Sequence, residues 1–189
     1  MASATSTWET LGTIKTLAHL LGDSLFYWPI SPSPRDSLTI YKFKEPSVSP
    51  DWSEHDIVIN AEEIEHIHVR YPAEIFDAEA MAVDPLNGDI LIFTKDHNNA
   101  VCNVFKVPHG AGDPKTMEYI TTFPIWSVTG ADISPSGDTL ALINYHEGFS
   151  WSKPAGWAWV DYLRTNPSAC TLVLQPDEPQ REAVTAVDK

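Results

Sequence analysis

The hydrophobic pattern is clearest in residues 78–94, where small residues, a turn signal and bulky residues follow one another. Residues 78–83 read AEAMAV, and residues 90–94 read ILIFT. Between them stands Asn87-Gly88, a dipeptide that favours the positive backbone φ angles of a two-residue hairpin turn. The sequence therefore predicts two strands that pair antiparallel across this turn.

The same design returns about 50 residues later. Small residues at 128–133 precede Ser136-Gly137, and bulky apolar residues follow at 139–143. A third copy begins at 181–188. The segments between the copies also correspond in pairs, and these pairs predict two outer strands per unit: 37–44 with 101–108, and 65–72 with 117–124.

A period near 50 residues with four strands per unit is the sequence mark of a β-propeller. We therefore predict an all-β fold, a partial β-propeller with about two full four-stranded antiparallel blades and partial flanking blades. The predicted blades start near residues 77, 128 and 181 and occupy residues 35–189. Four such blades need about 200 residues, so 189 residues predict part of a ring. A compact sandwich of about ten strands is the alternative.

Residues 1–34 do not follow the repeat, and we predict a non-repeat segment there. Ser6 and Glu9 fit a capping box at the start of a helix. The apolar residues that follow have helical spacing and end before Gly22, a residue typical of helix C-termini. The sequence therefore predicts one N-terminal amphipathic helix, followed by a stiff proline-rich linker at 29–34.

Charge and hydrophobicity argue against nucleic-acid binding and against a membrane span. The 26 acidic and 12 basic residues give a net charge of −14, which repels nucleic-acid backbones, and no basic patch is visible in the sequence. No apolar run is long enough for a membrane span. The N-terminus lacks the basic residues of a secretory signal. We expect an acidic, soluble protein that binds no nucleic acid, and its localisation stays open.

Catalytic motifs of the common classes are absent from the sequence, including nucleophile elbows and phosphate-binding glycine loops. His66 and His68 lie two apart on a predicted strand, so their rings share a face, as a pair of zinc ligands would. Solvent-facing histidines are the simpler interpretation. Cys102 and Cys170 have no metal-type spacing and are expected to be buried apolar residues, with a disulfide between them left open.

Three tryptophans lie close together in the third unit: Trp151, Trp157 and Trp159. Aromatic rings can stack on sugars, which suggests a carbohydrate-binding module. The plainer interpretation is that these tryptophans fill the wide gap between the outer parts of neighbouring blades.

The inner strands carry a resemblance to known proteins. Residues 77–85 with Gly88, and residues 128–135 with Gly137, resemble a group of uncharacterised β-propeller proteins. That group is distantly akin to the gluconolactonase/senescence-marker and phytase-like propellers. In such proteins, acidic residues at the start of the inner strands ring one mouth of the axial channel. The resemblance therefore implies a calcium site here, with its ligands at Glu79, Asp132 and Glu182, and with Asp77 beside them.

Three functions follow from these observations. The leading hypothesis is a binding or scaffold module of the β-propeller type, whose partner is an unknown small molecule or protein. The second is a divalent-cation-dependent hydrolase or lactonase that uses the axial carboxylates. The third is the carbohydrate-binding module. The open edges of an incomplete ring would also allow self-association.

Overall fold

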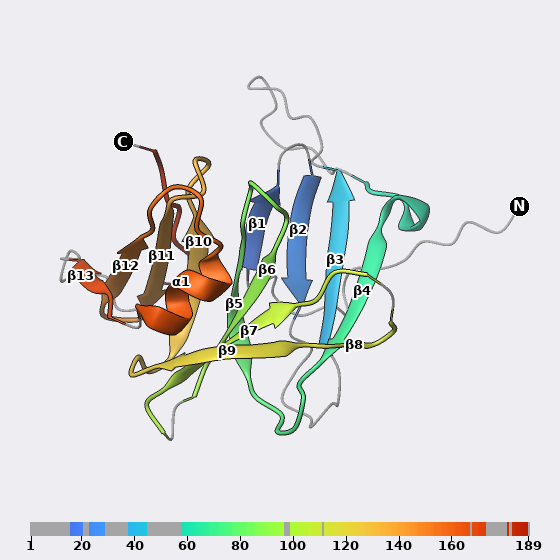
Figure 1. Ribbon diagram of the computed structural model, residues 1–189. Helices are drawn as coiled ribbons and strands as arrows, with labels where there is room; N and C mark the ends of the chain where they lie inside the picture. Colours follow the sequence, from blue (N-terminus) through green and yellow to red (C-terminus); the bar gives the residue numbers. More distant parts are fainter. Residues whose placement is uncertain are drawn as a thin grey trace, which may run out of the picture.

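A computed structural model gives the fold of the chain. It describes residues 16–20, 23–28, 38–44, 58–96, 99–110, 112–166, 168–172, 181 and 183–188. In the first two of these ranges it describes the backbone only. Three antiparallel sheets account for most of the described chain, and we call them the first, second and third blade (Figure 1).

The first blade is a meander of four consecutive antiparallel strands, to which a fifth strand from the next blade adds in parallel. A short 3-10 helix at Ala61–Glu63 precedes its fourth strand. The strands are β1 (Thr16–Leu20), β2 (Asp23–Trp28), β3 (Leu38–Lys44), β4 (Glu65–Arg70) and the added β8 (Lys115–Thr116).

The prediction of an N-terminal helix is wrong for residues 16–20, the part of that segment that the structure describes. Residues 16–20 form β1, whose register pairs Thr16 with Tyr27 and Leu20 with Asp23 of β2. The apolar spacing of this segment suits a helix, but the aromatic-rich residues of β2 offer it a strand partner, and pairing overrides local preference. Because β2 pairs with β3, strands on both sides of the predicted boundary at residue 35 lie in one sheet. The predicted capping box and proline-rich linker lie outside the described residues.

The second and third blades repeat the four-stranded antiparallel order. The second contains β5 (Ala78–Val83), β6 (Ile90–Thr94), β7 (Cys102–Val107) and β9 (Glu118–Phe123). The third contains β10 (Val128–Ile133), β11 (Thr139–Asn144), β12 (Gly148–Ser152) and β13 (Cys170–Leu172). A helix, α1 (Trp159–Thr165), precedes β13. The predicted pairing of residues 78–83 with 90–94 is confirmed.

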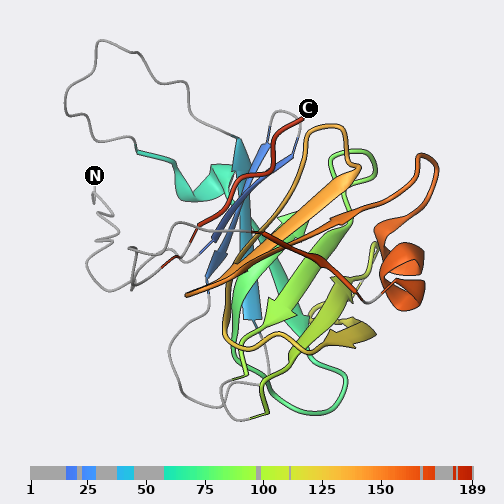
Figure 2. The ribbon, with the colours of Figure 1, turned by 90° about the vertical axis from the view of Figure 1, so that its left-hand side faces the viewer.

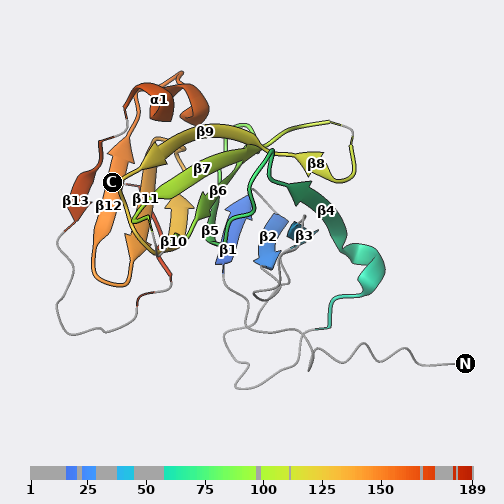
Figure 3. The same ribbon diagram turned by 90° about the horizontal axis from the view of Figure 1, so that it is seen from below.

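The first strands of the three blades gather at the centre of the molecule. β5 packs against β10, and β1 packs against both of them. From this centre the blades spread outward in three directions (Figures 1 and 3). The predicted fold class, a partial β-propeller, is therefore confirmed. Among the described residues, the α-helix is α1, which lies on the far side of the molecule from the first blade (Figure 2).

Side-chain size follows position in each blade. The inner strands carry small buried residues, among them Ala80, Ala82 and Ala131, which let the backbones approach closely at the centre. One apolar core fills the space between the second and third blades and includes Trp159 of α1. A second core, centred on Phe105 and Ile40, lies between the first and second blades. These two cores hold the blades together, since burial of apolar surface is the main force for folding.

The C-terminal segment lies against β10. Thr129 Oγ1 donates a hydrogen bond of 2.6 Å to the Arg181 carbonyl, and Ala186 N donates one of 2.9 Å to Asp132 Oδ2. Ser136 N donates to Asp188 Oδ1 at 2.9 Å. The described residues of 181–188 therefore lie along β10, although no strand is assigned to them.

The turn between β5 and β6 differs from the predicted two-residue hairpin. Only Gly88 has a positive φ angle, of 75°, and the loop is closed by Asp84 N, which donates to the Asp89 carbonyl at 2.9 Å. Proline at 85 has its φ fixed near −65°, and the Asp84 carboxylate accepts the Leu86 N–H at 2.9 Å. These constraints lengthen the turn to residues 85–88.

Gly137 occupies the corresponding turn of the third blade and gives a stability prediction. Both Gly88 and Gly137 have left-handed φ angles, of 75° and 74°. A methyl group at 88 would meet open space, whereas one at 137 would lie 2.7 Å from the Leu86 side chain. Gly88→Ala is expected to cost about 1 kcal/mol from backbone strain, and Gly137→Ala somewhat more, because the Leu86 side chain, which is 66% exposed, must move aside. Urea titration of both variants measures the difference, and equal losses would contradict the close contact between these turns.

Candidate functional site

Glu79, the first predicted calcium ligand, lies at a β-bulge on the inner strand β5. Ala78 pairs with Thr94 and Ala80 with Phe93, so Glu79 is the extra residue between them. Its carboxylate forms an ion pair with Lys95 Nζ, and the two side chains are only 12% and 5% exposed. Lys95 Nζ also donates a hydrogen bond of 2.8 Å to Tyr145 Oη in the third blade. The predicted ligand is therefore already bound to a cation of the protein.

The environment of Lys95 keeps its ammonium group charged. Burial by itself lowers the pKa of Lys95, but the hydrogen bonds with Glu79 and Tyr145 outweigh it, so the pKa is raised above its ordinary value. The ammonium group also lies 4.8 Å from the centre of the Tyr145 ring. A charged lysine in this position compensates the carboxylate of Glu79 and ties the second blade to the third.

Tyr145 continues this polar chain. Arg181 Nη1 donates a hydrogen bond of 3.0 Å to the Tyr145 carbonyl. A connected series of polar groups thus runs from the second blade through the third to the C-terminal segment. Buried networks of this kind stabilise one arrangement of the elements that they join, provided that each member has its partner.

The other predicted ligands that the structure describes have different hydrogen-bond partners. The Asp132 carboxylate accepts the Ala186 N–H, whereas Asp77 is exposed and its carbonyl accepts the Lys95 N–H at 2.8 Å. Glu182 lies outside the described residues. Among those residues, no group of three or more His, Cys, Asp or Glu side chains has a geometry that could hold a metal ion. Calcium binding at these four positions stays a prediction.

The two histidines of β4 have other partners. His68 Nδ1 lies 3.1 Å from Thr39 Oγ1, and the His66 ring packs edge-on against Tyr41 at 4.9 Å. Both cysteines are free. Cys102 is buried as predicted, and burial raises the pKa of its thiol, whereas Cys170 is exposed, contrary to the prediction. Cys170 lies on β13, which is the edge strand of the third blade among the described strands.

The three predicted stacking tryptophans do not share one surface. Trp151 and Trp159 are 3% and 0% exposed, and Trp157 is 47% exposed. Trp151 stacks on Phe123 of the second blade at 4.7 Å, and Trp159 Nε1 donates to the Gly137 carbonyl at 3.1 Å. Two of the three rings therefore fill the gap between blades, as the plainer interpretation expected.

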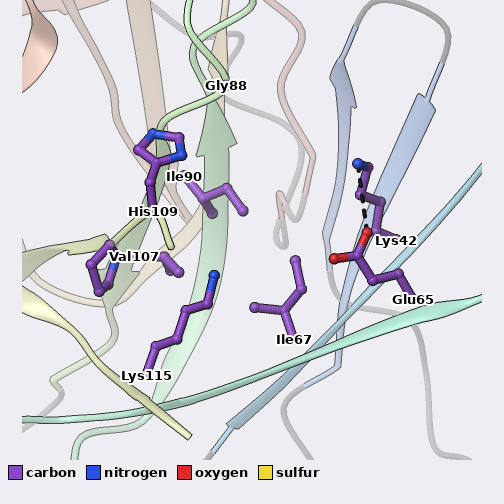
Figure 4. Close-up of a pocket in the computed structure, with 9 residues that line it drawn as sticks. Lys42, Glu65, Ile67, Gly88, Ile90, Val107, His109 and Lys115 are labelled. Carbon is purple, nitrogen blue, oxygen red and sulfur yellow. Dashed lines mark ion pairs between the residues drawn. The ribbon is translucent and has the colours of Figure 1, made fainter. Parts of the chain in front are cut away.

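A cleft opens between the first and second blades, on the side where β8 crosses from one to the other. We call it the inter-blade cleft, and its volume is about 150 Å³. Its apolar lining comes from Ile67 of β4, Ile90 of β6 and Val107 of β7. In Figure 4 the side chain of Lys115 points into the space between Val107 and Ile67.

Four polar side chains also line the cleft: Lys42, Glu65, His109 and Lys115. Lys42 Nζ lies 3.7 Å from the Glu65 carboxylate, an ion pair that faces the cleft from the first blade (Figure 4). On the opposite side His109 Nε2 lies 2.6 Å from Asp89 Oδ1. Lys115 completes the set, and no carboxylate among the described residues lies within ion-pair distance of its ammonium group. Lys115 therefore brings an uncompensated positive charge to an apolar cleft.

The pairing of β8 with β4 positions Lys115. β8 belongs to the β7–β9 connection of the second blade, yet Lys115 pairs with Val69 of the first. Met117 N donates to the Arg70 carbonyl and Arg70 Nε donates to Thr116 Oγ1, each at 2.8 Å. The strand that carries the lysine is therefore anchored to the opposite wall of the cleft.

Sequence reasoning missed this cleft. Lys42 lies more than 60 residues from His109 and Lys115, and no spacing rule connects it to them. The parallel crossing of β8, which brings them together, has no strong sequence signal because the strand is only two residues long. The net negative charge of the chain gives no sign of the lysine in this cleft.

Comparisons with known proteins add little to this picture. No protein-family model matches the chain, and none of the curated proteins is similar to it. Among solved structures, the chain is similar to one described as "Structure of Dos1 propeller", with a TM-score of 0.34 and 11% sequence identity. The match covers 72% of this chain and 30% of that structure, so this chain spans less than a third of its length. No helix among the described residues is long and apolar enough to cross a membrane.

Proposed function

We propose that this chain is a binding module of the β-propeller type and that the inter-blade cleft is its binding site. The observation that supports the proposal is Lys115, an ammonium group without a carboxylate partner among the described residues, held over an apolar lining. Small-molecule sites commonly combine apolar walls with a few well-placed polar groups. The anchored strand β8 holds the lysine in place before any ligand arrives.

The two alternative functions have less support. A cation-dependent hydrolase or lactonase would need Glu79 to exchange Lys95 for a metal ion. A carbohydrate platform would need exposed rings, and Trp157 alone among the three predicted tryptophans is substantially exposed. Kinship with the gluconolactonase/senescence-marker and phytase-like propellers also stays a prediction.

A fragment screen tests the proposed site. We expect fragments that bind the full chain to shift the methyl NMR signals of Ile67, Ile90 and Val107, because these residues line the cleft. Ile67→Trp should fill the cleft and abolish that binding, since it adds bulk to a half-buried lining position. Ile75→Trp is the matched control, because Ile75 is 48% exposed and does not line the cleft.

The screen can also reject the proposal. Fragments that bind equally well to wild type and Ile67→Trp would show that the cleft is not the binding site. Fragments whose shifts gather at the outer face of the third blade, around Trp157, would favour the carbohydrate alternative instead.

A further inference from the structure

We infer that the inter-blade cleft binds a small monocarboxylate with a short hydrocarbon chain, its carboxylate on Lys115 and its hydrocarbon against Ile67, Ile90 and Val107. This inference rests on the proposed function, because it names the ligand class of the same site. It combines the unpaired ammonium group with the apolar lining that lies next to it.

The charge around the cleft favours an anion with a single charge. Glu65 is paired with Lys42. Asp89 accepts both Lys106 Nζ, at 2.8 Å, and His109 Nε2. Lys115 is the lining cation that has no carboxylate partner among the described residues, so one anionic group can pair with it without displacing another ion pair. A dianion such as phosphate would place a second negative charge beside apolar walls without a free cation to pair with it, which is costly.

The apolar lining selects for a hydrocarbon beside the carboxylate. Ile90 and Val107 are 8% and 5% exposed, so each presents a narrow apolar surface to the cleft, and half-buried Ile67 presents more. Displacing water from these walls favours an apolar group, and each fully buried methylene raises affinity by up to about fourfold. A bare anion such as acetate would leave these walls wet and should bind weakly.

The size of the cleft limits the chain length. Its volume is about 150 Å³. Sites for drug-sized ligands are larger, about 300–1,000 Å³. Affinity should therefore rise from acetate through butanoate to hexanoate and stop rising once the hydrocarbon extends beyond the cleft.

The test compares hexanoate with hexanamide, which has the same shape but no charge, in titrations of the full chain at low salt. The readout is the methyl NMR signals of Ile67, Ile90 and Val107. We expect hexanoate to bind at least tenfold more tightly than hexanamide. Lys115→Met should weaken hexanoate by at least tenfold and leave hexanamide unchanged. Lys44→Met is the matched control, since Lys44 is exposed on β3 and does not line the cleft.

Three results would contradict different parts of this inference. Equal binding of hexanoate and hexanamide at these methyl groups would overturn the carboxylate assignment and leave the cleft as a binding site. Unchanged hexanoate binding by Lys115→Met would overturn the role of the lysine. Absence of any ligand from the cleft, here and in the fragment screen, would overturn the proposed function as well.

Discussion

Replacing Trp159 by alanine is expected to lower the free energy of unfolding by about 4 kcal/mol, the range found when a fully buried aromatic residue is truncated. Trp159 is 0% exposed and packs in the core between the second and third blades. The variant also loses the hydrogen bond to the Gly137 carbonyl and the contact with Lys153, whose ammonium lies 5.4 Å from the ring centre. Urea unfolding followed by circular dichroism measures the loss without relying on tryptophan fluorescence.

Trp157→Ala is the control for this prediction. It makes the same substitution two residues away, on a side chain that is 47% exposed. We expect a loss of no more than about 1 kcal/mol, because substitutions at exposed positions have small effects. Similar losses for the two variants would contradict the assignment of Trp159 to the core between blades. Wild-type stability in Trp159→Ala would contradict it too.

Replacing Lys95 by methionine is expected to cost about 3 kcal/mol or more. The change leaves the Glu79 carboxylate largely buried without its cation, and breaking one side of a buried pair typically costs 3–5 kcal/mol. It also removes the hydrogen bond to Tyr145 that joins the second and third blades. The double variant with Glu79→Gln should recover part of the loss, because the uncompensated charge is gone.

Lys42→Met is the matched control for Lys95→Met. Its partner Glu65 lies 3.7 Å away, and the two side chains are 31% and 63% exposed. Exposed pairs contribute little, so a loss below about 1 kcal/mol is expected. If Lys95→Met lost no more stability than this control, the ion pair with Glu79 would not be a buried link between blades.

The ion pair also predicts a pH dependence. Because the pKa of Lys95 is raised in the folded chain, its contribution to stability is fully present below the ordinary lysine value of 10.5. That contribution is lost as the pH rises through the folded-state pKa, so this part of the alkaline destabilisation should be missing in Lys95→Met. Thermal melts of wild type and Lys95→Met at alkaline pH measure this difference. Melts of wild type with added calcium test the predicted cation site, since a cation bound to the native state would raise the melting temperature.

Much of the second and third blades could be predicted from the sequence. In each of these blades, a strand of small residues is followed by a glycine turn and a strand of bulky apolar residues. Residue size and turn residues are both local features of the sequence. The inner strands of the first blade could not be predicted from the apolar spacing of residues 16–20, because that spacing also suits a helix. The aromatic run at Phe26, Tyr27 and Trp28 is the signal that favours a strand, and it acts through pairing with β1.

The candidate site depends on contacts that are not local. Lys95 directly follows Thr94, the residue that pairs with Ala78, so its proximity to Glu79 could have been predicted from the hairpin register. The inter-blade cleft could not, because it depends on a two-residue parallel strand that brings Lys115 to Val69. Such crossings depend on the packing of whole blades, which residue spacing does not reveal.

The most direct test of the cleft as a binding site is a crystal structure of the full chain grown with hexanoate. We expect the carboxylate within about 4 Å of Lys115 Nζ, the usual ion-pair distance, and the hydrocarbon against Ile67, Ile90 and Val107. Hexanoate bound elsewhere on the chain, with the inter-blade cleft filled only by water, would contradict both the site and its ligand class.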